Sequence, residues 1–204
     1  MRSRSCFSFI WFGVLLLFAV CAAAQSNSSA RRNEKSSIDS NDAREYSVLA
    51  AILKLHYRGD GRSVVIDDTL EPCGGSTSSL VGTDAQLSAS DFESAFSECH
   101  SNANQKVSLS RLHIKNRLIP IVESEYRKYF KLDCEEGWNR FYRKYPKSHG
   151  YVRLSRVGFD PSKKFALLNF SYMAGCMNGE GHLLLLKNVD GEWKVVGDAS
   201  LWMV

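Results

Sequence analysis

The last quarter of the chain most constrains its fold, because it has the pattern of four strands joined by short turns. The expected strands are Tyr151 to Phe159, Phe165 to Tyr172, His182 to Lys187 and Trp193 to Val204. Turn-forming residues separate them: Asp160-Pro161-Ser162, a glycine-rich loop at 174–181, and Asn188-Val189-Asp190-Gly191. Short connections join antiparallel neighbours, so we expect a four-strand meander.

Side-chain patterns within these strands predict how the sheet is covered. Leu183 to Leu186 is apolar without alternation, which is typical of a strand buried on both faces. In the second strand, Ala166, Leu168, Phe170 and Tyr172 share one face, whereas Asn169 and Ser171 lie on the other. This alternation predicts that the second strand is covered on one side only.

Helical patterns dominate the chain before the meander. A first helix is expected to begin near Asn41 or Asp42, because its apolar residues recur at helical spacing: Tyr46, Leu49, Ala50, Leu53 and Tyr57. A second helix is expected at 91–99 with Ser90 as its N-cap. Ser124 opens a third, whose end carries an aromatic stripe before Pro146: Trp138, Phe141, Tyr142 and Tyr145.

Two further segments between these helices read as strands. Val64-Val65-Ile66 is short and β-branched, and Arg117 to Val122 contains Pro120, which restricts that strand to an edge or Pro120 to a strand start. The sequence therefore predicts an α+β fold, in which N-terminal helices pack on one face of a mainly antiparallel sheet that ends in the four-strand C-terminal meander.

The N-terminus has the three parts of a secretory signal peptide. Arg2 and Arg4 precede a nearly all-apolar stretch from Phe7 to Val20, and Ala22-Ala23-Ala24 provides a cleavage site. We expect residues 1–24 to be removed, 25–40 to form a disordered tether, and 41–204 to form a single domain. Export then predicts a periplasmic or extracellular protein without a transmembrane segment in the mature chain. Lipidation at Cys21 is an alternative that the residues before it fit less well.

Charge and cysteine content limit the partners and the compartment. The formal net charge is +4, and two of the positive charges leave with the signal peptide, so charge predicts no nucleic-acid partner. The mature chain keeps four cysteines, which allow three disulfide pairings. We favour Cys73–Cys99 and Cys134–Cys176, since the first would link a Gly/Ser-rich loop to the nearby second helix.

Several motifs near the C-terminus are similar to those of a family of exported bacterial proteins. They are "LSRVGF" at 154–159, the Gly-x-Trp-Lys-Val pattern at 191–195, and a final Trp in "LWMV". The family has no assigned activity, so the resemblance implies a shared fold and carries over no catalytic residue. Members often have Cys-Gly-x-Gly where this chain has Cys176-Met177-Asn178-Gly179.

Cys176 and His182 are the sharpest candidates for chemistry. A thiolate paired with an imidazole is the basis of a cysteine nucleophile, and Asp198 would then orient the His182 ring. A disulfide at Cys176 and a packing role for His182 are the structural interpretation, which we favour for an exported chain. The histidines and cysteines share no metal-ligand spacing, so we predict neither a metal nor a cofactor.

Four basic residues form the other candidate site, on the side of the third helix opposite its aromatic stripe: Arg140, Arg143, Lys144 and Lys147. They would suit an anionic envelope component, although a solvated helix face has the same pattern. Asp67 and Asp68, which follow the first strand, are expected to end it in solvent.

We therefore favour an exported, non-enzymatic domain that binds or modulates a component of the cell envelope. The alternatives are a thiol-dependent hydrolase centred on Cys176 and His182, and a small exported enzyme inhibitor that acts through the loop at 174–181.

Overall fold

The computed structural model describes residues 43–75, 80, 87–101, 105–131 and 133–204. The sheet and the side chains that cover it belong to one structural unit, Glu45–Val204. The expected signal peptide at 1–24, the alternative lipidation at Cys21, the tether at 25–40 and the helix start at Asn41 or Asp42 lie outside the described residues.

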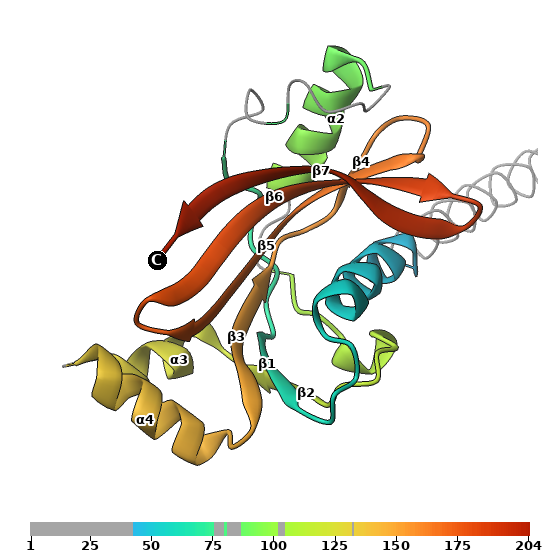
Figure 1. Cartoon of the computed structure of the whole chain (residues 1–204). Coiled ribbons are helices and arrows are strands. Elements are labelled where there is room, and N and C mark those ends of the chain that lie inside the picture. The colour runs from blue at the N-terminus through green and yellow to red at the C-terminus, as the bar shows by residue number, and fades with distance from the viewer. Residues whose placement is uncertain (1–42, 76–79, 81–86, 102–104, 132) are drawn as a thin grey trace, which may run out of the picture. The chain divides into compact units, whose positions relative to one another are not determined.

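The C-terminal strands form the predicted meander, which runs as adjacent ribbons in Figure 1. It contains, in antiparallel order, β3 (Ser148–Leu154), β5 (Phe165–Gly175), β6 (Asn178–Val189) and β7 (Glu192–Met203). The first strand differs from the prediction, since it starts earlier and is interrupted before the short β4 (Gly158–Phe159), which also pairs with β5. Glu71 pairs with the chain at the interruption: its N–H donates to Leu154 O, and its carbonyl accepts from Arg156 N–H.

Two parallel strands extend the meander into a mixed sheet. β1 (Ser63–Asp67) pairs in parallel with both β3 and β2 (Leu118–Ile121), which gives the order β2-β1-β3-β5-β6-β7. Pro120 lies in the edge strand β2, as predicted, where its missing N–H removes no bond of the inner ladder. The fold class is α+β.

The two hairpin turns of the meander differ in how well the sequence predicted them. Asp190 and Gly191 have φ of 54° and 88° between β6 and β7, as a tight two-residue turn requires. The glycine-rich loop expected at 174–181 is mostly strand, and only Cys176 and Met177 stand between β5 and β6. Gly179 and Gly181 belong to β6, and Trp202 of β7 lies against both: a Cβ would collide with the indole at Gly181 and be tightly packed at Gly179.

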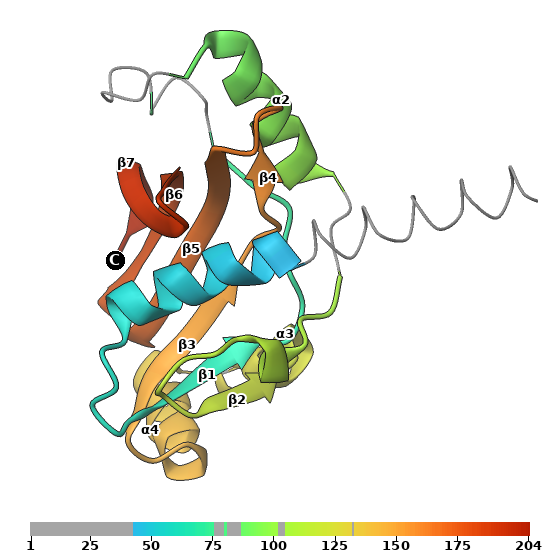
Figure 2. The ribbon, with the colours of Figure 1, turned by 90° about the vertical axis from the view of Figure 1, so that its right-hand side faces the viewer.

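One face of the sheet, here called the closed face, is covered by the helix at 43–56 and carries one continuous apolar cluster. Figure 2 shows this helix in front of the sheet. Leu49 and Leu53 of the helix are fully buried together with Leu168 and Phe170 of β5. The cluster extends across the sheet from β1 to β6. The predicted apolar face of this helix is confirmed.

The opposite face, here called the divided face, carries two separate apolar clusters. Beneath α2 (Ala89–His100) lie Leu167, Leu183 and Leu185. Beneath α3 (Glu123–Tyr129) and α4 (Cys134–Lys144) lie Val65 and Tyr151. Helices therefore cover the second face as well as the one expected, because β5 and β6 alternate apolar residues toward both faces.

Helix boundaries also differ from those expected. Ser88, not Ser90, caps α2 by accepting from Asp91 N–H at 3.1 Å. The expected third helix is two helices, because Asp133 caps α4 separately by accepting from Glu136 N–H at 2.9 Å. A short 3₁₀ turn at Leu109–Arg111 precedes β2.

Both favoured disulfides are present, and both hold the covers of the divided face. Cys73–Cys99 links α2 to the segment after β1, with its Cα atoms 5.4 Å apart. Cys134–Cys176 links the first residue of α4 to the β5–β6 turn, with its Cα atoms 5.9 Å apart. Each bridge thus stabilises one of the two covers.

Candidate functional site

A polar strip separates the two apolar clusters of the divided face. Along β5 the residues on this face run from Leu167, beneath α2, through Asn169 and Ser171 to Met173, beside α3 and α4. The neighbouring strand β3 adds Arg153 directly opposite Ser171. The covers therefore leave the middle of this face without an apolar layer.

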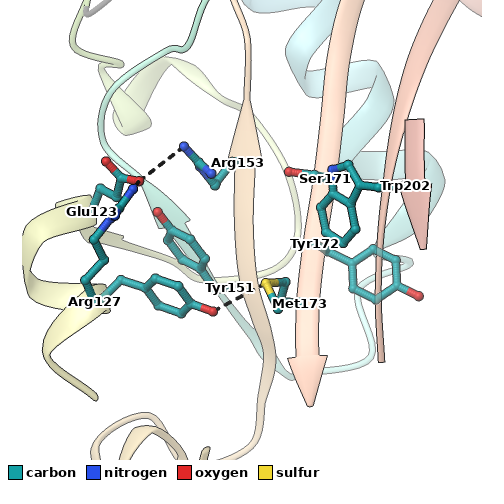
Figure 3. Close-up of a pocket in the computed structure, with 9 residues that line it drawn as sticks. Glu123, Arg127, Tyr151, Arg153, Ser171, Tyr172, Met173 and Trp202 are labelled. Carbon is teal, nitrogen blue, oxygen red and sulfur yellow. Dashed lines mark hydrogen bonds and ion pairs between the residues drawn. The ribbon is translucent and has the colours of Figure 1, made fainter. Parts of the chain in front are cut away.

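A small cleft of about 200 Å³ lies over this strip (Figure 3). Its apolar lining is mainly aromatic and comes from four elements, α3, β3, β5 and β7: Tyr126, Tyr151, Tyr172, Met173 and Trp202. Its polar lining consists of Glu123, Arg127, Arg153 and Ser171. In Figure 3, Glu123 and Arg127 of α3 lie at the left of the view and Trp202 lies at the right.

Two glycines fix the position of Trp202. A Cβ on Gly181 would lie 2.2 Å from Trp202 Nε1, and a Cβ on Gly179 would lie 3.3 Å from the far edge of the indole. The ring therefore lies close against β6, where only glycine leaves room for it. Because the Trp202 residue is still 39% exposed, part of the indole remains free for a ligand.

Opposed charges form the polar wall of the cleft. Arg127 Nε and Nη2 both donate to Glu123 Oε1, at 3.1 and 2.6 Å. Arg153 Nη2 lies 3.4 Å from the same oxygen and also forms an ion pair with Glu71. Burial lowers the pKa of the Arg153 guanidinium, and its Nε has no hydrogen-bond partner among the described residues. The wall therefore contains a buried donor atom whose hydrogen bond is not made within the described residues.

Asp67 supports the floor of the cleft from below. Its carboxylate is buried and accepts a 2.5 Å hydrogen bond from Tyr151 Oη, and the Tyr151 ring stacks on Tyr126 at 3.8 Å. Burial raises the pKa of Asp67, and the Tyr151 hydrogen bond opposes that shift. The prediction that Asp67 ends its strand in solvent is wrong, because β1 lies inside the sheet beneath α3.

A second cavity of about 510 Å³ continues from the cleft along α3 and α4. The two cavities share Tyr126, Arg127 and Met173, so we treat them as one groove. The second also has Asp133 and Trp138 in its lining. Trp138 is 5% exposed, and its Nε1 has no hydrogen-bond partner in the described part of the chain. Each half of the groove is therefore lined by a residue that has a buried donor atom without a partner among the described residues.

The predicted catalytic residues do not come together. Cys176 is bonded to Cys134 and packs beside the α3–α4 cluster of the divided face. His182 pairs across the sheet with Phe170, a closed-face residue, and lies on that opposite face. His182 Nδ1 does meet Asp198 Oδ1 at 2.7 Å, so two of the three form a pair without the thiol.

The four basic residues proposed for binding are all exposed at and beyond the C-terminal half of α4. Arg143 forms an ion pair with Glu136 at 3.0 Å, and Glu135 and Glu136 make the first turn of the helix acidic. Arg140, Lys144 and Lys147 carry the remaining positive charge. The basic surface is thus confined to one end of α4.

No three or more His, Cys, Asp or Glu side chains of the described residues are grouped closely enough to hold a metal ion. None of the described helices has the length and apolar character needed to cross a bilayer.

Comparison with protein-family models, with curated proteins and with solved structures gave no match, so no relative assigns a role to any residue of the groove. The resemblance of the C-terminal motifs to exported bacterial proteins stays a hypothesis. The sequence did carry a signal for the groove, since Asn169 and Ser171 interrupt one face of an otherwise apolar strand. Nothing in the sequence pointed to Glu123, Arg153 or Trp202 as neighbours, because they come from three distant segments.

Proposed function

We propose that this chain is an exported, non-enzymatic binding domain that holds a component of the cell envelope in the groove. The observation that carries the proposal is the groove itself, with a partly exposed Trp202 opposite the Arg127–Glu123–Arg153 charges. Ligand sites typically combine an apolar or aromatic lining with a few fixed polar groups.

The polar strip is unfavourable for the stability of the fold, and this supports the assignment. An apolar side chain at Arg153 or Ser171 would join the two clusters of the divided face into one core. Instead, the strip keeps a half-buried guanidinium and an unpartnered donor, which are unfavourable for folding. Groups that are unfavourable for stability are expected where a ligand supplies the missing partners.

Export and the envelope location rest on two observations and one general rule. The N-terminal sequence has signal-peptide character, the chain contains two disulfides, and such bonds persist mainly in oxidising compartments. The exposed basic end of α4 would add attraction to an anionic envelope surface.

The disulfide at Cys176 argues against the thiol-dependent hydrolase. A thiol-dependent hydrolase needs a free thiolate beside its base, whereas this sulfur is bonded to Cys134. The alternative hydrolase therefore lacks its nucleophile in the oxidised protein.

The test is sedimentation of the purified, oxidised protein with a bacterial cell-envelope preparation. We expect saturable binding that Trp202→Ala weakens at least about tenfold, because a central aromatic contact is lost. Trp193→Phe is the matched control, since Trp193 packs with Phe159 and donates to Ser47 away from the groove. Absence of binding by the folded wild-type protein, or equal binding by Trp202→Ala, would refute the proposal.

One observation favours the inhibitor as a second candidate. Met177 is 83% exposed at the tip of the β5–β6 turn, and the adjacent Cys176 fixes that turn to α4. A rigid turn with a single exposed apolar side chain suits insertion into a foreign active site. Met177→Asp would abolish inhibition of such an enzyme and leave envelope binding through the groove unchanged.

A further inference from the structure

We infer that the groove binds a neutral oligosaccharide. This inference rests on the proposed function, since it names the class of ligand for the same groove. It comes from the partly exposed Trp202 ring, the balance of charge, and the length of the groove.

Trp202 offers the flat surface that a sugar ring requires. A pyranose has one face made of C–H groups, which packs on an aromatic ring, while its hydroxyls point outward at the rim. Gly179 and Gly181 hold the indole close to β6, so the ring is positioned before the ligand arrives. A cleft of about 200 Å³ beside it is small enough to select a single ring rather than a bulky group.

The polar wall matches hydroxyl groups, which both donate and accept. Glu123 supplies an acceptor, Arg127 and Arg153 supply donors, and Ser171 supplies both. Hydrogen bonds to these charged groups are stronger than neutral ones, so they fix the orientation of a sugar that has no charge of its own.

The charge balance disfavours a strongly charged ligand. The groove is lined by two guanidinium groups, Arg127 and Arg153, and by two carboxylates, Glu123 and Asp133. A polyanion would have to displace Glu123 from both arginines, to which it already binds. An acyl chain would leave these same charges buried without water.

The length of the groove points to more than one sugar. The second cavity, about 510 Å³, continues from the first through the shared residues Tyr126, Arg127 and Met173. Arg153 lines the first cavity and Trp138 the second, so polar and aromatic side chains are present along both.

The experiment titrates the oxidised protein with a soluble N-acetylglucosamine tetrasaccharide by isothermal calorimetry. We expect saturable binding that Trp202→Ala weakens about tenfold or more. Gly181→Ala is the second variant, since it keeps the tryptophan but displaces the indole. It should weaken binding to a similar degree, and Trp193→Phe should bind as the wild type does. Thermal melts of every variant confirm that each is folded.

The outcomes separate this inference from the proposed function. Wild-type protein that binds the envelope through Trp202 but not the tetrasaccharide would overturn the glycan assignment and leave the binding function intact. Binding of vesicles of phosphatidylglycerol and phosphatidylethanolamine in place of the sugar would overturn it equally. Sugar binding that is unchanged in both Trp202→Ala and Gly181→Ala would refute the placement in this groove.

Discussion

The two faces of the sheet are covered in different ways. The closed face has one helix, one continuous apolar cluster and no disulfide among its described residues. The divided face has two smaller clusters, a disulfide at each cover, and a polar strip between them. The contrast indicates that burial alone stabilises the first face, whereas the second combines burial with covalent links and leaves room for a ligand.

The small size of its two apolar clusters explains why the divided face needs disulfides. A cover that buries less apolar surface contributes less to folding, at roughly 25 cal/mol for each Å² removed from water. Disulfides compensate by lowering the conformational entropy of the unfolded chain. The four predictions that follow test whether the two faces really depend on these different sources of stability.

The largest effect is expected from Phe170→Ala on the closed face. Phe170 is fully buried and stacks on His56 at 4.1 Å, so its truncation should lower the free energy of unfolding by about 3–5 kcal/mol. Trp202→Ala on the divided face should lower it by less than about 1 kcal/mol, because that residue is 39% exposed. Urea denaturation measures both.

Phe170→Leu serves as a milder variant if Phe170→Ala does not fold. An equal decrease in the free energy of unfolding for Phe170→Ala and Trp202→Ala would contradict the distinction between the closed face and the divided face.

The next effect is expected from removing the bridge that holds α4. The Cys134→Ala/Cys176→Ala double variant opens a loop of 42 residues, which should lower the free energy of unfolding by about 3–4 kcal/mol. Hydrogen exchange should rise in α4 and stay unchanged in the helix at 43–56.

Met177→Ala is the control for a change in the same turn, and we expect it to leave exchange in α4 unaltered. Equal acceleration in both helices would show that the two faces do not unfold separately.

A smaller effect is expected from deleting Leu201 to Val204. The deletion removes the bond from Val204 N–H to Gly179 O, and it removes Leu201 from the cluster beneath α2. The free energy of unfolding should fall by about 1–3 kcal/mol, with a lower melting temperature. An unchanged melting temperature would contradict the role of this strand end in the sheet.

The smallest effect concerns His56 on the closed face. Burial, together with the nearby His182, lowers the pKa of His56 below its ordinary value of 6.5, whereas Glu180 and Asp198 act in the opposite direction. A histidine with a lowered pKa stabilises the folded state fully above 6.5, and this contribution is lost as the pH falls below that value.

His56→Gln should therefore lose less stability than the wild type when urea denaturation at pH 8 is compared with pH 5. A greater loss in the variant would show that protonated His56 stabilises the fold instead.

Local patterns in the sequence were sufficient for the meander, the edge strand and the apolar face of the first helix. The alternation in β5 and the Asp190-Gly191 turn are properties of adjacent residues, so they need no knowledge of distant ones. The favoured disulfides were also right. The assignment of Gly179 and Gly181 to a turn was wrong. Both lie in β6, where they leave room for the indole of Trp202, about twenty residues away along the chain.

By itself, the sequence determined the fold class, the antiparallel order of the C-terminal strands, and the polar break in β5 at Asn169 and Ser171. Only the tertiary structure decided that this break lies between two covers and that Glu123, Arg153 and Trp202 meet around it. The physical reason is range: periodicity and turn chemistry act between neighbours along the chain, whereas a groove is made by segments that only the packing of the sheet brings together.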